Sequence, residues 1–171
     1  MKHIIMTLLC STLSFAAIDN INSFEADFTQ TVTDDKNTSL NYSGYVQAKK
    51  PQNALWSYKK PVKKDVYISN RRVTIVEPEI EQVIIRRINT GFDFFKMVKN
   101  ATKIAKNVYE ANYKNTRFTI YLKNNLIEKI SYKDEFDNSV VIQFKKQKQN
   151  TKLENDIFIA KFPLYFDIIR D

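Results

Sequence analysis

Hydrophobic and polar residues alternate over most of this sequence, and short polar breaks containing Asn, Asp or Pro separate the alternating runs. A period of two is typical of a strand with one buried face. Because the runs follow one another through short turns, we expect an antiparallel sheet. The predicted strands are residues 40–48, 54–58, 65–69, 73–77, 81–88, 118–122, 126–132, 139–144 and 157–166.

Two of the breaks predict tight hairpins, at Asn70-Arg71 and at Asn124-Asn125. Asn favours such turns because it tolerates the positive φ that they require. The first part of the chain is ambiguous. Phe24, Phe28 and Val32 recur at every fourth position, which permits a helix leading into a strand within residues 18–32.

A helix is predicted around residues 92–106, where apolar residues follow helical spacing and lysines fill the other side. A lone amphipathic helix must lay its apolar face on the sheet. Two roles remain open for it. It either covers the core, or it forms a lid over a cavity lined by Phe92, Phe94, Phe95 and Met97.

The chain is organised around residues 44–61, which read as strand, basic corner, strand. A Lys-Lys-Pro corner ends each of the two strands, since Pro donates no backbone N–H and pushes the preceding residue out of helix. Alternation in the second strand places Ala54, Trp56 and Tyr58 on one face. The stretch predicts an apolar surface with a cationic rim.

Residues 1–16 have a short basic start, an apolar run and small residues at the −3 and −1 positions, which predicts a secretory signal peptide. The mature chain is then residues 17–171, which make one domain of ordinary size. No other stretch is long and apolar enough to span a membrane.

The residue types restrict the chemistry. The sequence has one Cys, Cys10, and one His, His3, and both lie in the predicted signal. The mature chain therefore has no disulfide, no Ser-His or Cys-His pair and no Cys or His ligand for a metal. We expect that the protein is not an enzyme and that it has no cofactor and no metal site. A hydrolase using paired carboxylates among Glu77, Glu79 and Glu81 remains an alternative.

A formal net charge of +8 favours anionic partners such as membranes, acidic proteins or nucleic acid. A solvated basic surface explains the same charge. Lysines that alternate with aromatic residues also suit a platform for single-stranded nucleic acid. The predicted signal argues against that platform, because a secreted protein seldom meets nucleic acid.

Three segments together resemble the LolA family of periplasmic carriers of outer-membrane lipoproteins. Residues 23–30, SFEADFTQ, are similar to an F-x-A-x-F-x-Q start. Residues 44–61 have the family's Gly, basic-basic-Pro, Trp and Pro in order. Residues 89–92, NTGF, are placed like the family's N-x-P-F lid segment, and Phe-x-x-x-Phe-Pro follows at residues 158–163.

The resemblance implies a mainly β fold with some α: an incomplete antiparallel β-barrel, or half-barrel, with helices covering its concave apolar face. It implies a periplasmic carrier in a Gram-negative cell that holds the acyl chains of triacylated lipoproteins. The implied partners are an ATP-driven release complex in the inner membrane and an outer-membrane acceptor. We expect this carrier to be a monomer that does not bind nucleic acid. A related half-barrel module that senses a lipid or protein without transport is the alternative, and an appended domain or anchor would favour it.

The resemblance also implies roles for single residues. Lys50 stands where the family has a lid-gating arginine, and a lysine keeps the charge but loses the planar fork. Ala54 stands where a bulky residue is usual, and Gly91 replaces the lid proline. Residues 17–23 leave little room for the family's N-terminal helix. The expected acyl-chain cavity consists of Phe28, Trp56, Tyr58, Phe92, Phe95 and Met97.

Overall fold

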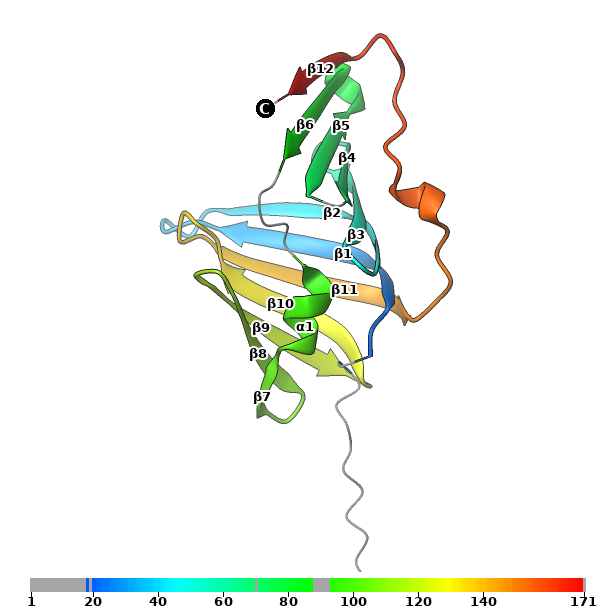
Figure 1. Cartoon of the computed structure of the whole chain (residues 1–171). Helices are drawn as coiled ribbons and strands as arrows, with labels where there is room; N and C mark the ends of the chain where they lie inside the picture. The colour runs from blue at the N-terminus through cyan, green and yellow to red at the C-terminus, as the bar shows by residue number, and fades with distance from the viewer. Residues whose placement is uncertain (1–17, 19, 70, 88–92, 171) are drawn as a thin grey trace, which may run out of the picture.

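Strand β1 (Ser23–Thr33) occupies the middle of the fold, because it pairs with β2 on one side and with β11 on the other. The computed structural model describes residues 18, 20–69, 71–87 and 93–170. Within them one 12-stranded sheet has the order β12-β6-β5-β4-β3-β2-β1-β11-β10-β9-β8-β7 (Figure 1). The other strands are β2 (Ser39–Lys49), β3 (Asn53–Lys60), β4 (Lys64–Ser69), β5 (Arg72–Glu77), β6 (Gln82–Arg87), β7 (Thr102–Ala105), β8 (Val108–Tyr113), β9 (Thr116–Lys123), β10 (Leu126–Lys133), β11 (Ser139–Gln149) and β12 (Asp167–Arg170).

The sheet is open. Its two edge strands, β12 and β7, lie at opposite ends of the order and far apart in Figure 1. The strand pairings are antiparallel, except that β12 runs parallel to β6. The prediction of a mainly β fold with an unclosed antiparallel sheet is confirmed.

Short turns with positive φ angles join many of the neighbouring strands. Asn124 and Asn125 have φ angles of 51° and 63° between β9 and β10, so the predicted hairpin is confirmed. Arg71 has a φ of 66° between the paired strands β4 and β5, which confirms the other hairpin. Asn70 lies outside the described residues.

The interpretation of residues 18–32 as a helix leading into a strand is wrong for the described residues, because 23–33 are a single strand. A spacing of four is also a multiple of two, so it suits one face of a strand as well as a helix. Phe24, Ala26 and Phe28 are all at most 2% exposed. We call the sheet face that carries these three residues the inner face, and the opposite face the outer face.

The predicted helix over 92–106 is too long. Helix α1 (Phe94–Lys99) has six residues, and residues 102–105 form β7 instead. β-branched Thr102 and Ile104 favour extended backbone, and β8 supplies the hydrogen-bond partner. Phe92 lies outside the described residues. The expected set of helices over the inner face is not confirmed, since α1 is the one α-helix in the part of the chain that the structure describes.

The predicted strand at 157–166 is also wrong. A 3-10 turn, η2 (Asn155–Phe158), and an extended connection occupy these residues, and β12 begins only at Asp167. We call residues 150–166 the C-terminal strap. Phe162 and Phe166 of the strap pack on Val76 and Val83 at the outer face of β5 and β6. Pro163 lies between them and cannot donate a ladder hydrogen bond.

A buried carboxylate on the outer face holds the start of this strap. Glu25 is 8% exposed and accepts a 2.8 Å hydrogen bond from the Tyr45 hydroxyl. Lys148 Nζ lies 3.4 Å from Glu25, and the Thr151 hydroxyl donates to it at 3.4 Å. Burial opposes ionisation of Glu25, but the hydrogen bonds from Tyr45 and Lys148 and the charge of Lys148 outweigh it and lower its pKa. Strands β1, β2 and β11 and the strap therefore meet at one anion.

Replacing this carboxylate should make stability less dependent on acid pH. A lowered pKa means that Glu25 stabilises the fold above the unfolded-state pKa, near 4.5, and that this contribution is lost as pH falls through the folded-state pKa. We expect Glu25→Gln to cost about 1–2 kcal/mol at pH 7. The difference from wild type should shrink below pH 4.5 in urea unfolding.

The exposed Asp35→Asn variant, in the β1–β2 turn, is the control and should behave like wild type at both pH values. If the loss in free energy of unfolding caused by Glu25→Gln stays constant down to acid pH, the stabilisation by Glu25 does not depend on its ionisation.

Candidate functional site

The F-x-A-x-F-x-Q segment builds the floor of the inner face. Because it lies on a strand, its period of two turns Phe24, Ala26, Phe28 and Gln30 to the same side. The Phe28 ring meets Trp56 and Tyr58 edge to face, with centroids 5.0 Å and 5.1 Å away. Gln30 Oε1 accepts a 3.1 Å hydrogen bond from the Tyr58 hydroxyl. The motif therefore places and supports the aromatic side chains of β3.

Gly44 allows this aromatic packing. It lies in β2 directly between Phe28 of β1 and Tyr58 of β3. A Cβ at this position would overlap the Ser57 carbonyl oxygen and come within 2.8 Å of Phe28 Cε1. The absence of a side chain at Gly44 lets Phe28 reach across β2 to the rings of Trp56 and Tyr58.

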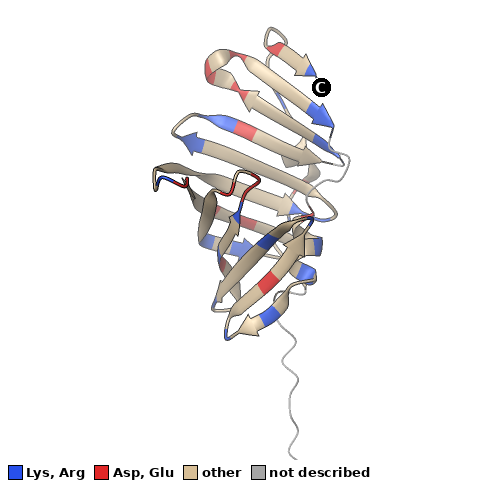
Figure 2. Cartoon of the chain, turned by 90° about the vertical axis from the view of Figure 1, so that its left-hand side faces the viewer, with Lys and Arg blue, Asp and Glu red and all other residues tan. Residues whose placement is uncertain are grey.

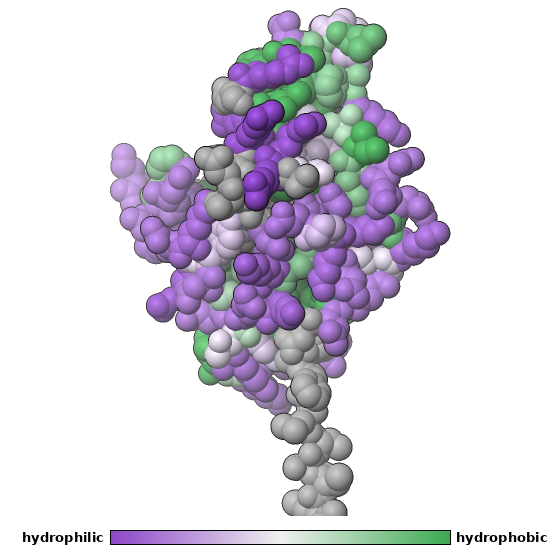
Figure 3. Space-filling view, in the orientation of Figure 1, coloured by the Kyte–Doolittle hydropathy of each residue, from purple (hydrophilic) through white to green (hydrophobic). Residues whose placement is uncertain are grey.

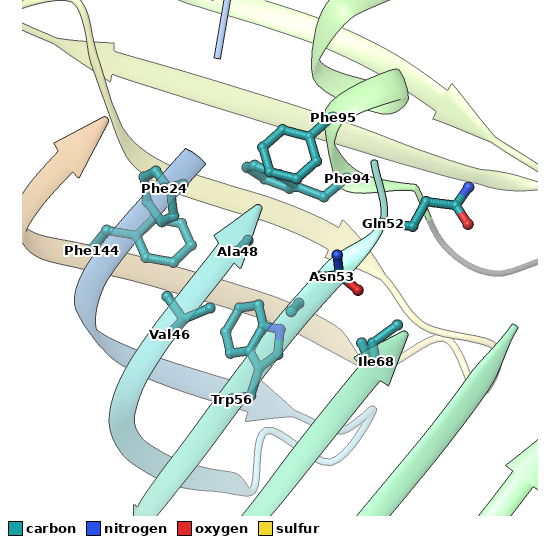
Figure 4. Close-up of a pocket in the computed structure, with 11 residues that line it drawn as sticks. Phe24, Val46, Ala48, Gln52, Asn53, Trp56, Ile68, Phe94, Phe95 and Phe144 are labelled. Carbon is teal, nitrogen blue, oxygen red and sulfur yellow. The ribbon is translucent and has the colours of Figure 1, made fainter. Parts of the chain in front are cut away.

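An apolar cavity lies between the inner face and α1. Its larger lobe has a volume of about 290 Å³ and its smaller lobe about 40 Å³. Trp56, Ile68, Phe94 and Phe144 line both lobes, so we treat the two as one inner cavity. Figure 4 shows the smaller lobe, with Phe94 and Phe95 of α1 opposite Trp56 and Ile68 of the sheet. The other lining residues are Phe24, Gln30, Val46, Ala48, Gln52, Asn53, Ala54, Tyr58, Val66, Met97, Phe118, Ile130, Tyr132 and Ile142.

The inner cavity has no charged side chain among these lining residues. Burial, followed by the nearby Tyr132 and Tyr42, raises the pKa of Tyr58 to about 12. Burial, with a smaller effect of Asp134, also raises the pKa of Tyr132. Both hydroxyls are therefore neutral at physiological pH. Such a cavity suits an uncharged, apolar ligand.

The structure places most of the predicted cavity residues around this space. Trp56, Tyr58, Phe95 and Met97 line it, whereas Phe28 lies beneath Trp56 and Tyr58 as a supporting ring. Phe92 lies outside the described residues. The opposite wall from β9, β10 and β11 was not predicted. Its alternating apolar residues are visible in the sequence, but they reach the cavity only because β11 pairs with β1.

Lys50, expected at the lid, lies on the exposed β2–β3 corner and donates from Nζ to Asn22 Oδ1 at 3.0 Å. The corner reaches α1 through a different residue. Gln52 Nε2 donates to Asp93 Oδ2 at 3.2 Å. The other oxygen of Asp93 accepts from the Lys96 backbone N–H at 2.9 Å, which caps the start of α1. Asp93 thus joins the helix to the corner.

Packing of its apolar residues also holds α1 in place. Phe95, Met97 and Val98 are buried and join the cluster that includes Tyr109 and Ala111 of β8. The helix therefore rests on the β8 side of the sheet, and its start lies next to β3 and the corner. One short helix closes one side of the inner cavity.

These features define a class of protein, an open β-sheet protein with an apolar cavity between its inner face and a short helical cover. Residues 19–108 match the family model described as outer membrane lipoprotein carrier protein LolA. The chain belongs to the LolA family.

Relatives agree with this assignment. The chain is 43% identical over 156 residues to the outer-membrane lipoprotein carrier protein of Campylobacter jejuni, covering 91% of each chain. It is 29% identical over 171 residues to the protein of that name from Wolinella succinogenes, covering 99% of each. The fold is similar to the crystal structure of an uncharacterized conserved protein from Thermus thermophilus. There the TM-score is 0.56 at 11% identity, with 91% of this chain and 94% of the other covered.

Adding a methyl group at Gly44 should disturb the cavity floor. We expect Gly44→Ala to destabilise the protein by about 1–3 kcal/mol, because it crowds Phe28 and the Ser57 carbonyl. Trp56 is the single tryptophan of the sequence, so its emission should shift as well. Chemical unfolding followed by fluorescence measures both. Ser43→Ala, one residue earlier, should change neither, and equal effects of the two variants would refute the packing argument.

Removing the cap of α1 should loosen the cover of the cavity. Asp93→Ala deletes the bond to Lys96 and the bond from Gln52, at a cost of about 1 kcal/mol. We expect acrylamide to quench Trp56 fluorescence more strongly in this variant. Asp93→Asn retains a capping oxygen and should remain close to wild type. Unchanged quenching in Asp93→Ala would show that the cap does not control access to the cavity.

Proposed function

We propose that this protein carries lipoproteins to the outer membrane by holding their acyl chains in the inner cavity. The observation that carries the proposal is the uncharged cavity between Trp56 and α1, whose lining is mainly aromatic and aliphatic. An acyl chain has no group that needs a hydrogen-bond partner, and this lining offers few. Membership of a family described as lipoprotein carriers supports the same choice.

Burial of the acyl chain provides enough free energy for such a complex. At about 0.8 kcal/mol per methylene, a chain of roughly 15 methylenes gains about 12 kcal/mol on leaving water. A cavity that the protein filled with its own side chains would leave no room for the ligand. The rigid aromatic rings of Trp56 and Phe94 line the space with few rotamers to freeze on binding.

The proposal places the mature chain in the periplasm, because residues 1–16 have the features of a signal peptide. No helix among the described residues is long and apolar enough to cross a membrane. The proposed partners are triacylated lipoproteins, an ATP-driven release complex of the inner membrane and an outer-membrane acceptor. The protein acts as a monomeric binding protein and not as an enzyme.

We further propose that Lys50 affects the lid indirectly. Its ammonium group and its backbone N–H both bind Asn22, at 3.0 Å and 2.9 Å, which fixes the β2–β3 corner next to the start of β1. Gln52 on the same corner then contacts the helix cap at Asp93. Lys50 would bias the lid toward the closed position by holding the corner in place.

Native mass spectrometry of the mature protein, recovered gently from the periplasm, tests the carrier function. We expect a triacylated lipoprotein to co-purify with wild type. Trp56→Glu should lose it, because a carboxylate in the cavity has no cationic partner among the lining residues. Thr29→Glu, on the exposed outer face, should retain it. A ligand-free wild type, even with acylated lipoprotein supplied, would instead support a sensing module that transports nothing.

A further inference from the structure

Strand register extends the apolar surface of the inner cavity toward the edge of the sheet. Trp56 lies opposite Val66, and Val66 lies opposite Ile75 on the next strand. Ile75 lies opposite Ile84, which in turn lies beside Ile169 of β12. Directly opposed residues point to the same face. We call Val66, Ile75, Ile84 and Ile169 the inner-face row, and it begins at Trp56 in the cavity.

The two faces of β4, β5 and β6 are covered unequally. On the outer face, Thr74, Val76 and Val83 are 7%, 4% and 0% exposed, because the C-terminal strap packs nearby. On the inner face, Ile75 and Ile84 are only partly buried, and Ile169 is 43% exposed. The isoleucines of the inner face are thus more exposed than the smaller residues on the outer face of the same strands. A partly exposed row of this kind marks a binding surface more often than a finished core.

Charged residues flank the inner-face row on both sides, so an apolar ligand is expected to lie along the row. Charged residues of β4, β5 and β6 gather near the strand ends, and the middle of each strand is uncharged (Figure 2). Figure 3 shows hydrophobic residues concentrated in the upper part of the molecule, where these strands and the end of the C-terminal strap lie, while most of the remaining visible surface is hydrophilic. By its register, the inner-face row is an apolar band that crosses these strands.

The dimensions of the inner-face row match one acyl chain. From Trp56 to Ile169 it crosses four gaps between strands, which is roughly 19 Å at about 4.8 Å per gap. An acyl chain spans half of a hydrocarbon core about 30 Å thick, or roughly 15 Å. The larger lobe of the inner cavity, at about 290 Å³, is at the lower limit of ordinary ligand pockets, about 300 Å³. A ligand with several acyl chains needs more surface than this lobe provides.

We infer that the inner-face row is a second acyl-chain site, which takes a chain of a multiply acylated ligand that the inner cavity does not hold. This inference rests on the proposed function. It adds that different acyl chains of one ligand bind at two different positions on the inner face. One acyl chain lies under α1 against Trp56 and Phe94. Another lies across β4, β5 and β6 toward Ile169 at the edge strand. The row therefore sets a preference for ligands with more than one chain.

Synthetic lipopeptides that share one peptide and carry one, two or three palmitoyl chains test this division. Their affinities are measured by calorimetry for wild type, Trp56→Glu, Ile84→Glu and the outer-face control Thr29→Glu. We expect Ile84→Glu to weaken the two- and three-chain lipopeptides by roughly tenfold or more, since a carboxylate would have to lose water against the chain. The one-chain lipopeptide should bind to it as to wild type.

The outcomes separate the two proposals. If wild type binds none of the lipopeptides, the carrier function itself is wrong. If wild type binds all three and Ile84→Glu binds them equally well, the carrier function stands and the second site is wrong. A loss of affinity that is equal for one, two and three chains would also overturn the second site, because the row would then serve the cavity and not an additional chain.

A labelled variant gives an answer even where Ile84→Glu fails to fold. The mature sequence predicted here contains no Cys, so Ile84→Cys introduces a unique thiol for an environment-sensitive fluorophore. The label should move to an apolar environment when the three-chain lipopeptide binds and should not respond to the one-chain lipopeptide. Thr29→Cys with the same label should respond to neither. No response at position 84 to any bound lipopeptide would contradict the inference.

Discussion

Both faces of the β3–β6 half of the sheet carry apolar residues, and the described part of the chain covers one of them more fully than the other. The strap residues Phe158, Phe162 and Phe166 pack at the outer face. On the inner face, among the described residues, the same strands face the start of a six-residue helix across the inner cavity. Part of the apolar surface of the inner face therefore remains uncovered, although burial would be favourable. The inner cavity is the deepest part of this surface.

The charge distribution preserves this surface. The chain carries a net charge of +8, yet the residues around the inner cavity are uncharged. On the outer face, several charges are paired or lie over aromatic rings. Lys146 lies 3.3 Å from Asp27, and Lys129 lies 3.7 Å from the centroid of the Tyr121 ring. The outer face of β1, β9, β10 and β11 thus presents charged groups to water, and a ligand would enter the inner cavity without having to displace an ion pair among its lining residues.

Local patterns made much of this architecture predictable. Asn124 and Asn125 specify a hairpin because few residues accept positive φ, and the period of two placed Trp56 and Tyr58 on one face. The same local reasoning misjudged the chain where tertiary pairing decides the conformation. Residues 102–105 form a strand because they pair with β8, although the helical spacing of the segment predicts a helix. The spacing of four in the strap reflects contacts with the outer face and not a regular element of its own.

Contacts between distant parts of the chain could not be inferred from such patterns. Gln52 and Asp93 are 41 residues apart, and nothing in either segment indicates their hydrogen bond. Phe144 reaches the cavity because it lies opposite Phe28, although the two strands are separated by most of the chain. The resemblance predicted that a lid exists and drew attention to Lys50. Only the folded structure shows that the contact to the helix passes through Gln52.

The short helix fits the demands of a carrier, which must both retain its ligand and release it. Six residues are too few for a helix that is stable alone in water, so α1 depends on the packing of Phe95, Met97 and Val98 and on the cap at Asp93. A cover held by so few contacts opens at a low cost, and each 1.4 kcal/mol changes its open population about tenfold. A binding event on the β2–β3 corner that withdraws Gln52 from Asp93 would shift this balance without altering the sheet. In the proposed carrier, the acyl-binding surface would then remain constant, and the cover would determine when the ligand leaves.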